Sequence, residues 1–185
     1  REIRARIWED QVRARDAGDA VAFWLEQKLG RQCRLVYMPD DAVRRVDGCY
    51  ASAGETVSFA DGYPLLLISQ GSLDDLNSRL EQPVPMNRFS PNIVVEGCPA
   101  FAEDSWRRLR IGGLEMTVAK PCSRCVMPSI DQATAGRDPH INRVLASYRR
   151  RDGSVYFGQN LLYPQTGTIA VGAAVEVMDQ EIVHC

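Results

Sequence analysis

The sequence has few lysines, few histidines and no long hydrophobic segment. Two lysines stand beside twenty arginines among 185 residues. The two histidines, His140 and His184, form no recognisable acid–base pattern. The apolar run Leu65 to Ile68 is strand-sized, and no apolar run approaches the ~20 residues that span a bilayer. The sequence therefore indicates neither histidine-based catalysis nor a membrane span.

Composition and charge are those of a folded chain. Hydrophobic residues make up 45% and charged residues 25%, which excludes disorder and a coiled coil. The net charge of −2 gives no overall attraction to nucleic acid or to an acidic membrane, so neither is expected as a partner. Six cysteines without a secretory signal favour reduced thiols in a cytoplasmic protein.

The hydrophobic pattern predicts a mainly β protein (α+β) with about three helices, and the length suggests a single domain over residues 1–185. The expected strands cover residues 3–7, 35–38, 64–69, 93–95, 107–111, 114–118, 155–163 and 168–178. The expected helices cover residues 19–29, 73–80 and 141–149, with Ser72 capping the second. Gly112-Gly113 marks a hairpin, and residues 39–63 form a long polar connection.

The densest chemistry lies in the segment Lys120-Pro121-Cys122-Ser123-Arg124-Cys125. A Cys-x-x-Cys pair is compatible with half of a zinc site, a redox dithiol or two buried thiols. Zinc usually takes four ligands, and no second Cys-x-x-Cys or His-x-x-x-His is present. A thioredoxin-like dithiol should lie between a strand and a helix. Positive charge from Lys120 and Arg124 favours a thiolate at Cys125, which is a soft metal ligand.

Two further features have a structural and a functional interpretation. Trp8, Trp24 and Trp106 are expected in core or hairpin packing, the alternative being a cofactor contact. Arg149-Arg150-Arg151 follow a predicted helix and are expected as a solvated helix end, because the helix dipole favours cations there. The alternative is a docking patch for an electron donor.

Five segments stand in an order and spacing that resemble a known family. They are DDLNSRL at 74–80, RFSPNIVV at 88–95, AEDSW at 102–106, CSRC at 122–125 and FGQN at 157–160. Together they resemble the MOSC domain (molybdenum cofactor sulfurase C-terminal domain), most of all the mitochondrial amidoxime-reducing component and its bacterial relatives. The likeness runs from Trp8 to Met178. It implies an antiparallel β-barrel, and the family is also associated with pyridoxal phosphate binding.

The resemblance also implies a molybdenum-pterin cofactor and assigns roles by position. Cys125 matches the cysteine that binds molybdenum and would be the catalytic ligand. Asn92, Ser123 and the Asp61-Gly62-Tyr63 turn match residues that lie against the pterin and metal. Arg124 would balance the charge of the site.

Position 90 departs from the family pattern. The relatives usually have Arg-Pro-Asn where this chain has Ser-Pro-Asn, so Ser90 replaces a guanidinium that would face the cofactor. Arg88, two residues earlier, is a candidate replacement, because residues two apart in a strand lie on the same face.

The implied activity is the reduction of small N-hydroxylated compounds, such as hydroxylamines and amidoximes, with electrons from a ferredoxin-like domain or a separate reductase. The alternatives are a non-catalytic carrier of sulfur or molybdenum cofactor, and a structural β domain with buried thiols. No Cys-x₄-Cys-x₂-Cys array for an iron–sulfur cluster is present. The chain is expected to be a fragment that lacks a β-rich module before Glu2. We therefore expect it to be folded but cofactor-free, with Cys125 facing an open cleft.

Overall fold

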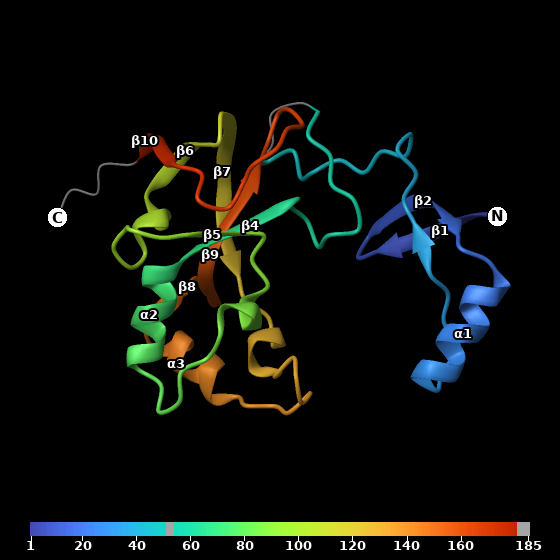
Figure 1. The fold of residues 1–185 in the computed structure, drawn as a ribbon, viewed down its shortest axis with the longest axis horizontal. Coiled ribbons are helices and arrows are strands. Elements are labelled where there is room, and N and C mark those ends of the chain that lie inside the picture. The colour runs from blue at the N-terminus through green and yellow to red at the C-terminus, as the bar shows by residue number, and fades with distance from the viewer. Residues whose placement is uncertain (51–53, 181–185) are drawn as a thin grey trace. The chain divides into compact units, whose positions relative to one another are not determined.

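The computed structural model describes residues 1–50 and 54–180, and the chain divides into two compact units, Arg1–Pro64 and Leu65–Cys185 (Figure 1). In chain order the elements are β1 (Glu2–Ile7), β2 (Asp10–Asp16), α1 (Asp19–Leu29), β3 (Val36–Tyr37), β4 (Leu65–Ser69), α2 (Gln70–Ser78), the 3₁₀ helix η1 (Met86–Phe89), β5 (Ile93–Val95), η2 (Ala102–Asp104), β6 (Trp106–Ile111), β7 (Leu114–Ser123), η3 (Met127–Ser129), α3 (His140–Arg149), β8 (Arg150–Arg151), β9 (Ser154–Leu162) and β10 (Val175–Gln180). In this described part, no helix is both long and apolar enough to cross a bilayer.

The first unit is a three-stranded antiparallel sheet with one helix. Strands β1 and β2 form a hairpin, and β3 pairs with β2. Strand β2 was not expected from the sequence, because only Val12 and Ala14 interrupt its polar residues; both are buried. Helix α1 ends where predicted, at Gly30, whose φ of 65° gives the left-handed cap that glycine adopts readily.

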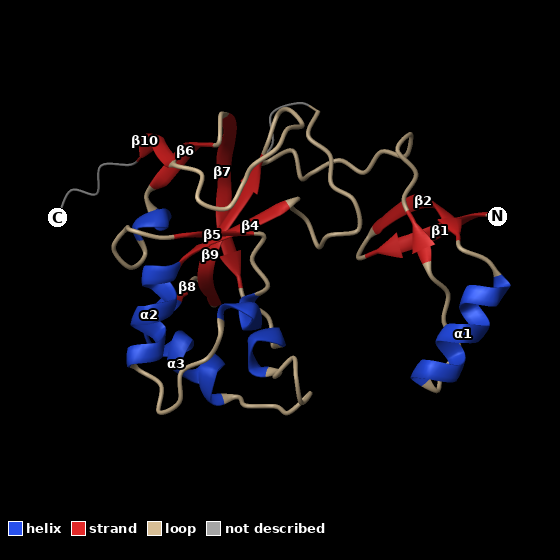
Figure 2. Cartoon of the chain, in the orientation of Figure 1, coloured by secondary structure: helices blue, strands red, loops and turns tan. Residues whose placement is uncertain are grey.

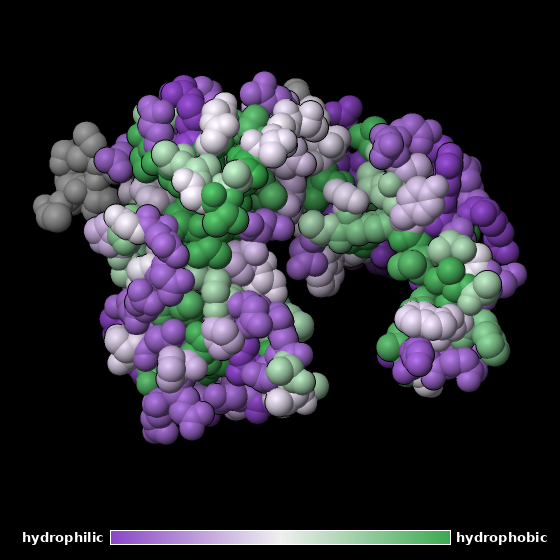
Figure 3. Space-filling view, viewed as in Figure 1, coloured by the Kyte–Doolittle hydropathy of each residue, from purple (hydrophilic) through white to green (hydrophobic). Residues whose placement is uncertain are grey.

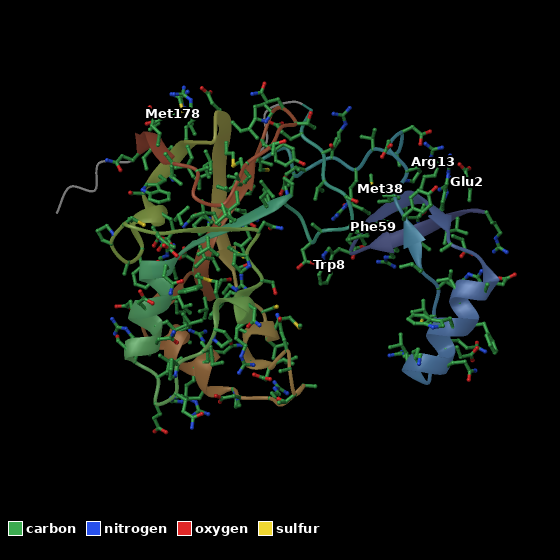
Figure 4. All side chains as sticks on the ribbon, viewed as in Figure 1. Glu2, Trp8, Arg13, Met38, Phe59 and Met178 are labelled. Carbon is green, nitrogen blue, oxygen red and sulfur yellow. The ribbon has the colours of Figure 1, made fainter. Side chains whose placement is uncertain are left out.

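Two of the three tryptophans are exposed. Trp8 lies in the turn of the β1–β2 hairpin and is 68% exposed (Figure 4), and Trp24 on α1 is 58% exposed. The prediction of core or hairpin packing is therefore wrong for both, whereas Trp106 is 5% exposed and confirms it. None of the residues of α1 is buried. Apolar residues accordingly show among the polar ones on the visible face of this unit (Figure 3).

The second unit is built on one curled sheet with the strand order β10-β6-β7-β9-β4-β5, and β8 pairs with β9. The predicted class, mainly β with three α-helices, is confirmed. The sheet is mixed rather than wholly antiparallel, because β5 runs parallel to β4 with Leu67 opposite Ile93. A parallel neighbour requires a crossover, and here α2 and η1 supply it.

The sheet carries a hydrophobic cluster on each face. Neighbouring residues of β4 point to opposite faces, so Leu67 joins one cluster and Ile68 the other. Helices α2 and α3 cover the second cluster (Figure 2). Within it the rings of Phe89 and Phe157 lie 4.6 Å apart, which fixes η1 against β9.

Several element boundaries differ from those predicted. Helix α2 begins at Gln70 because Ser69, not Ser72, is its cap: the Ser69 Oγ accepts a hydrogen bond from the Ser72 N–H at 3.1 Å. The strand expected from residue 168 begins at Val175. Strand β7 continues beyond the predicted residue 118 to Ser123, and this extension carries the first cysteine of the motif.

Substitution of Gly158 by alanine should destabilise the protein strongly. Gly158 in β9 has φ +83°, and a Cβ there would lie 2.6 Å from Ile68 Cγ1 and 2.8 Å from the Leu67 carbonyl oxygen. Gly153 is a matched control, with φ +80° and nothing within 4 Å of the added Cβ. We expect Gly158→Ala to lose about 1–3 kcal/mol more unfolding free energy than Gly153→Ala in urea denaturation. Equal losses would contradict the close approach of β9 to β4.

Candidate functional site

The candidate site lies where β7 ends. Strand β7 pairs antiparallel with β9, and irregularities on either side of Pro121 shift the register before Ser123 meets Tyr156. Proline has no N–H to give to the ladder, and such bulges redirect side chains. Ser123 is exposed at the end of the strand, and Cys125 follows two residues later.

Cys125 presents an exposed thiol just beyond the sheet. The preceding residue, Arg124, is anchored to β9, because its N–H donates to the Val155 carbonyl at 2.7 Å. The Cys125 Sγ accepts a hydrogen bond from the Met127 N–H at 3.5 Å. The backbone on one side of this thiol is therefore tied to the sheet, while the sulfur is accessible.

The Arg124 guanidinium joins the motif to η1. Its Nη1 donates to the Cys122 Sγ at 3.3 Å, and its Nη2 donates to the Phe89 carbonyl at 2.9 Å. Arg124, which the sequence predicted to act on the Cys125 thiol, thus contacts the sulfur of Cys122 instead. The Nε of Arg124 is buried without a hydrogen-bond partner among the described residues.

Arg88 is a buried cation with few partners. It lies on the 3₁₀ helix η1 rather than on a strand, so the expected alternation does not apply, and it is 7% exposed. Its Nη2 lies 3.8 Å from the Asp131 carboxylate. Its Nε and Nη1 are buried and lack a hydrogen-bond partner within residues 1–50 and 54–180. Unpaired N–H groups on a buried charge are costly, and an anionic ligand would satisfy them.

Asp131 gives Arg88 only partial compensation. Its Oδ1 accepts hydrogen bonds from the N–H groups of Ala133 and Thr134 and from the Thr134 hydroxyl. These bonds, led by the Thr134 N–H, lower the pKa of Asp131, and the Arg88 charge contributes further. The carboxylate is thus ionised but engaged by its own loop.

Ser90 and Asn92 leave η1 and enter β5. Ser90 has a left-handed φ of 52°, and its Oγ contacts the Asn87 carbonyl at 3.3 Å. The Asn92 Oδ1 accepts a hydrogen bond from the Leu66 N–H at 2.8 Å, and its own N–H donates to the Leu66 carbonyl at 2.9 Å. Asn92 therefore pins the start of β5 to β4.

The Asp61-Gly62-Tyr63 turn belongs to the first unit. A buried arginine, Arg44, holds this turn by donating to the carbonyls of Ser58, Ala60 and Asp61 at 3.0, 2.5 and 2.9 Å. It also pairs with the Asp10 carboxylate at 2.7 Å. Burial raises the pKa of Tyr63 to about 12. Sequence reasoning missed Arg44, which stands in a connection without periodicity.

Two other segments that carry the family resemblance, 102–106 and 157–160, have structural roles. Asp104 accepts hydrogen bonds from Gln159 Nε2 and Arg149 Nη2, both at 2.7 Å. Arg149 also donates to the Tyr156 carbonyl and stacks over the Phe101 ring at 4.2 Å. The prediction of a solvated helix end is therefore wrong for Arg149, which a carboxylate and a ring immobilise.

The buried carboxylate of Glu103 forms hydrogen bonds with the start of α2. Its Oε1 accepts hydrogen bonds from the Ser69 N–H at 3.2 Å and the Ser72 hydroxyl at 2.7 Å. Ser72, which the sequence suggested as the helix cap, is thus occupied in binding this carboxylate.

The described residues contain no group of three or more His, Cys, Asp or Glu side chains that could hold a metal ion. The zinc interpretation of the motif thus lacks a ligand set there. The site offers one exposed thiol, Cys125, next in sequence to Arg124. Sequence reasoning missed one neighbour of Cys125: Asn142 of α3, whose Nδ2 donates to the Cys125 carbonyl at 3.1 Å.

Comparison with known proteins places this site in a family context. The model of the MOSC domain matches residues 54–176. Mitochondrial amidoxime-reducing component 1 of Mus musculus is 35% identical over 96% of this chain and 56% of its own length, and the Homo sapiens protein gives the same values. Molybdenum cofactor sulfurase of Oryza sativa subsp. japonica is 34% identical over 78% of this chain and 20% of its length. The chain spans about half the length of the amidoxime-reducing relatives.

Replacement of Arg88 by methionine should be tolerated by the ligand-free protein. The change removes a buried charge whose N–H groups are unpaired, so the unfolding free energy should stay the same or rise by up to about 2 kcal/mol. Arg149→Met is the control, because Arg149 is also mostly buried but pairs with Asp104 and the Tyr156 carbonyl; it should lose about 3–5 kcal/mol. Denaturant unfolding measures both. A loss at Arg88 as large as at Arg149 would show that Arg88 is internally satisfied.

Proposed function

The chain belongs to the MOSC domain family, and we propose that it is the molybdenum-cofactor-binding part of an oxidoreductase that reduces N-hydroxylated compounds. The family supports a molybdenum-cofactor-related role, since its relatives include an amidoxime-reducing component and a molybdenum cofactor sulfurase. One observation carries the proposal. An exposed thiol, Cys125, lies two residues beyond the end of β7, and Arg88 on η1 carries a buried guanidinium with unpaired N–H groups.

Cys125 is the proposed metal ligand. When bound, the molybdenum-pterin group supplies two-electron redox chemistry, and the protein supplies orientation and charge. The thiol must lose its proton to bind metal. The Met127 N–H at 3.5 Å can donate to the resulting thiolate. Cys122 is less suited to the role, because it is half-buried and its Sγ already accepts from Arg124.

Arg88 and Arg124 are the proposed anion-binding groups. Their buried, unpaired N–H groups fit an oxyanion such as the phosphate of a pterin cofactor. Arg88 would thereby supply the guanidinium that the relatives usually carry at the position of Ser90. Asn92, Ser123 and the Asp61-Gly62-Tyr63 turn are proposed pterin contacts, a role that rests on their positions in the family motif.

The reaction requires an external electron donor, which we propose is a ferredoxin-like domain or a separate reductase. Reduction of a hydroxylamine consumes two electrons and two protons, breaks the N–O bond and releases an amine and water. The test is turnover of a hydroxylamine by cofactor-loaded protein with a reducing partner, measured as amine formed. Cofactor transfer to an acceptor protein without amine formation would instead identify a carrier module.

Substitution of Cys125 should separate the two cysteines of the motif. We expect Cys125→Ser to abolish molybdenum binding, because a hydroxyl is a poor soft-metal ligand, and Cys122→Ser to retain much of it. Metal and pterin analysis after reconstitution with excess cofactor measures both. Equal loss in the two variants would favour a shared dithiol site over a single thiolate ligand.

A further inference from the structure

Asn142 connects helix α3 to the backbone of Cys125. It lies in the first turn of the helix, which begins at His140. Its Nδ2 donates to the Cys125 carbonyl at 3.1 Å, across seventeen residues of sequence. Neither the motif around Cys125 nor the helical pattern of residues 141–149 assigns this residue a role.

The Cys125 sulfur is located by three contacts. Upstream, the Arg124 N–H is bonded to the Val155 carbonyl on β9 at 2.7 Å. Downstream, the Cys125 carbonyl is bonded to Asn142. With the backbone held on both sides, the direction of the Cα–Cβ bond is set, and only staggered χ1 rotamers remain. The Met127 N–H at 3.5 Å selects the position of Sγ.

The other end of the Asn142 amide is unpaired. Its Oδ1 is buried and has no hydrogen-bond partner in the part of the chain that the structure describes. A buried acceptor without a donor lowers stability, and an apolar side chain of the same shape would avoid that penalty. The amide is therefore unfavourable for packing, and its one bond is to the backbone of the exposed cysteine.

We propose that Asn142 is a positioning residue that fixes the Cys125 thiolate for metal binding, an inference that rests on the proposed role of Cys125. It acts through the Cys125 carbonyl and touches no reacting atom. Its removal should leave the fold intact while releasing the sulfur.

The experiment compares Asn142→Leu with Asn77→Leu in the full chain. Asn77 is the control, since it also ties an α-helix to a loop through an Nδ2 bond of 3.1 Å, to the Val84 carbonyl; its Oδ1 additionally accepts from the Val84 N–H at 2.8 Å. Iodoacetamide labelling of metal-free protein, read by mass spectrometry, gives the alkylation rate of Cys125 relative to Cys122. We expect that ratio to rise about fivefold in Asn142→Leu, the factor that one net hydrogen bond supports, and to stay unchanged in Asn77→Leu.

The conservative variant Asn142→Gln keeps an amide donor and should restore part of the ratio. Asn142→Leu should keep its melting temperature and retain molybdenum about fivefold less well after reconstitution. An alkylation ratio within twofold of the original would overturn the proposal, and Asn142→Ala, run in parallel, provides the same test if the leucine variant does not fold. The ratio needs no cofactor, so a chain that takes up no molybdenum even on reconstitution with excess cofactor refutes the proposed function without altering this measurement.

Discussion

The pairing of β7 with β9 is the constraint on which the site depends. These strands are separated by about thirty residues that include η3 and α3, yet their ladder brings the end of one against the start of the other. This ladder places the Cys-x-x-Cys motif at the end of β7, an interior strand of the sheet. The Arg124–Val155 hydrogen bond continues the ladder by one residue. Gly158 lets β9 approach β4 closely, so the ladder also fixes β4 and, through Asn92, the entry to β5. The thiol and η1 thus share one rigid support.

Local signals predicted much of this fold. The Gly112-Gly113 hairpin has positive φ at both glycines, as a two-residue turn requires, and Gly30 ends α1 in the left-handed conformation. The short apolar run before Ser69 is a buried strand as expected. Features that depend on distant partners were not predicted. The parallel placement of β5 follows from the route of the crossover, and Ser69 rather than Ser72 caps α2, while the Ser72 hydroxyl donates to Glu103.

The residues of the candidate site were likewise predicted where the signal is local and missed where it depends on distant partners. Cys125 was identified from the motif, because its chemistry is carried by residue type and spacing. Asn142 and Arg44 were not identified, since each contributes one hydrogen-bonding side chain to a backbone remote in sequence. No periodicity marks such residues. Arg88 was proposed on the assumption that it lies in a strand, whereas it lies on the 3₁₀ helix η1 and is buried there.

Three buried or nearly buried arginines show how partners distinguish structural from binding roles. Arg44 directs its guanidinium at three carbonyls and a carboxylate, and Arg149 pairs with Asp104 and the Tyr156 carbonyl. In both, the charge is neutralised or solvated by the protein itself, so each stabilises the fold without any ligand. Among the described residues, Arg88 has one carboxylate at 3.8 Å and two nitrogens without a hydrogen-bond partner. Burying a cation so poorly matched is unfavourable for folding alone. We propose that an oxyanion bound near the cysteine motif supplies the missing partner.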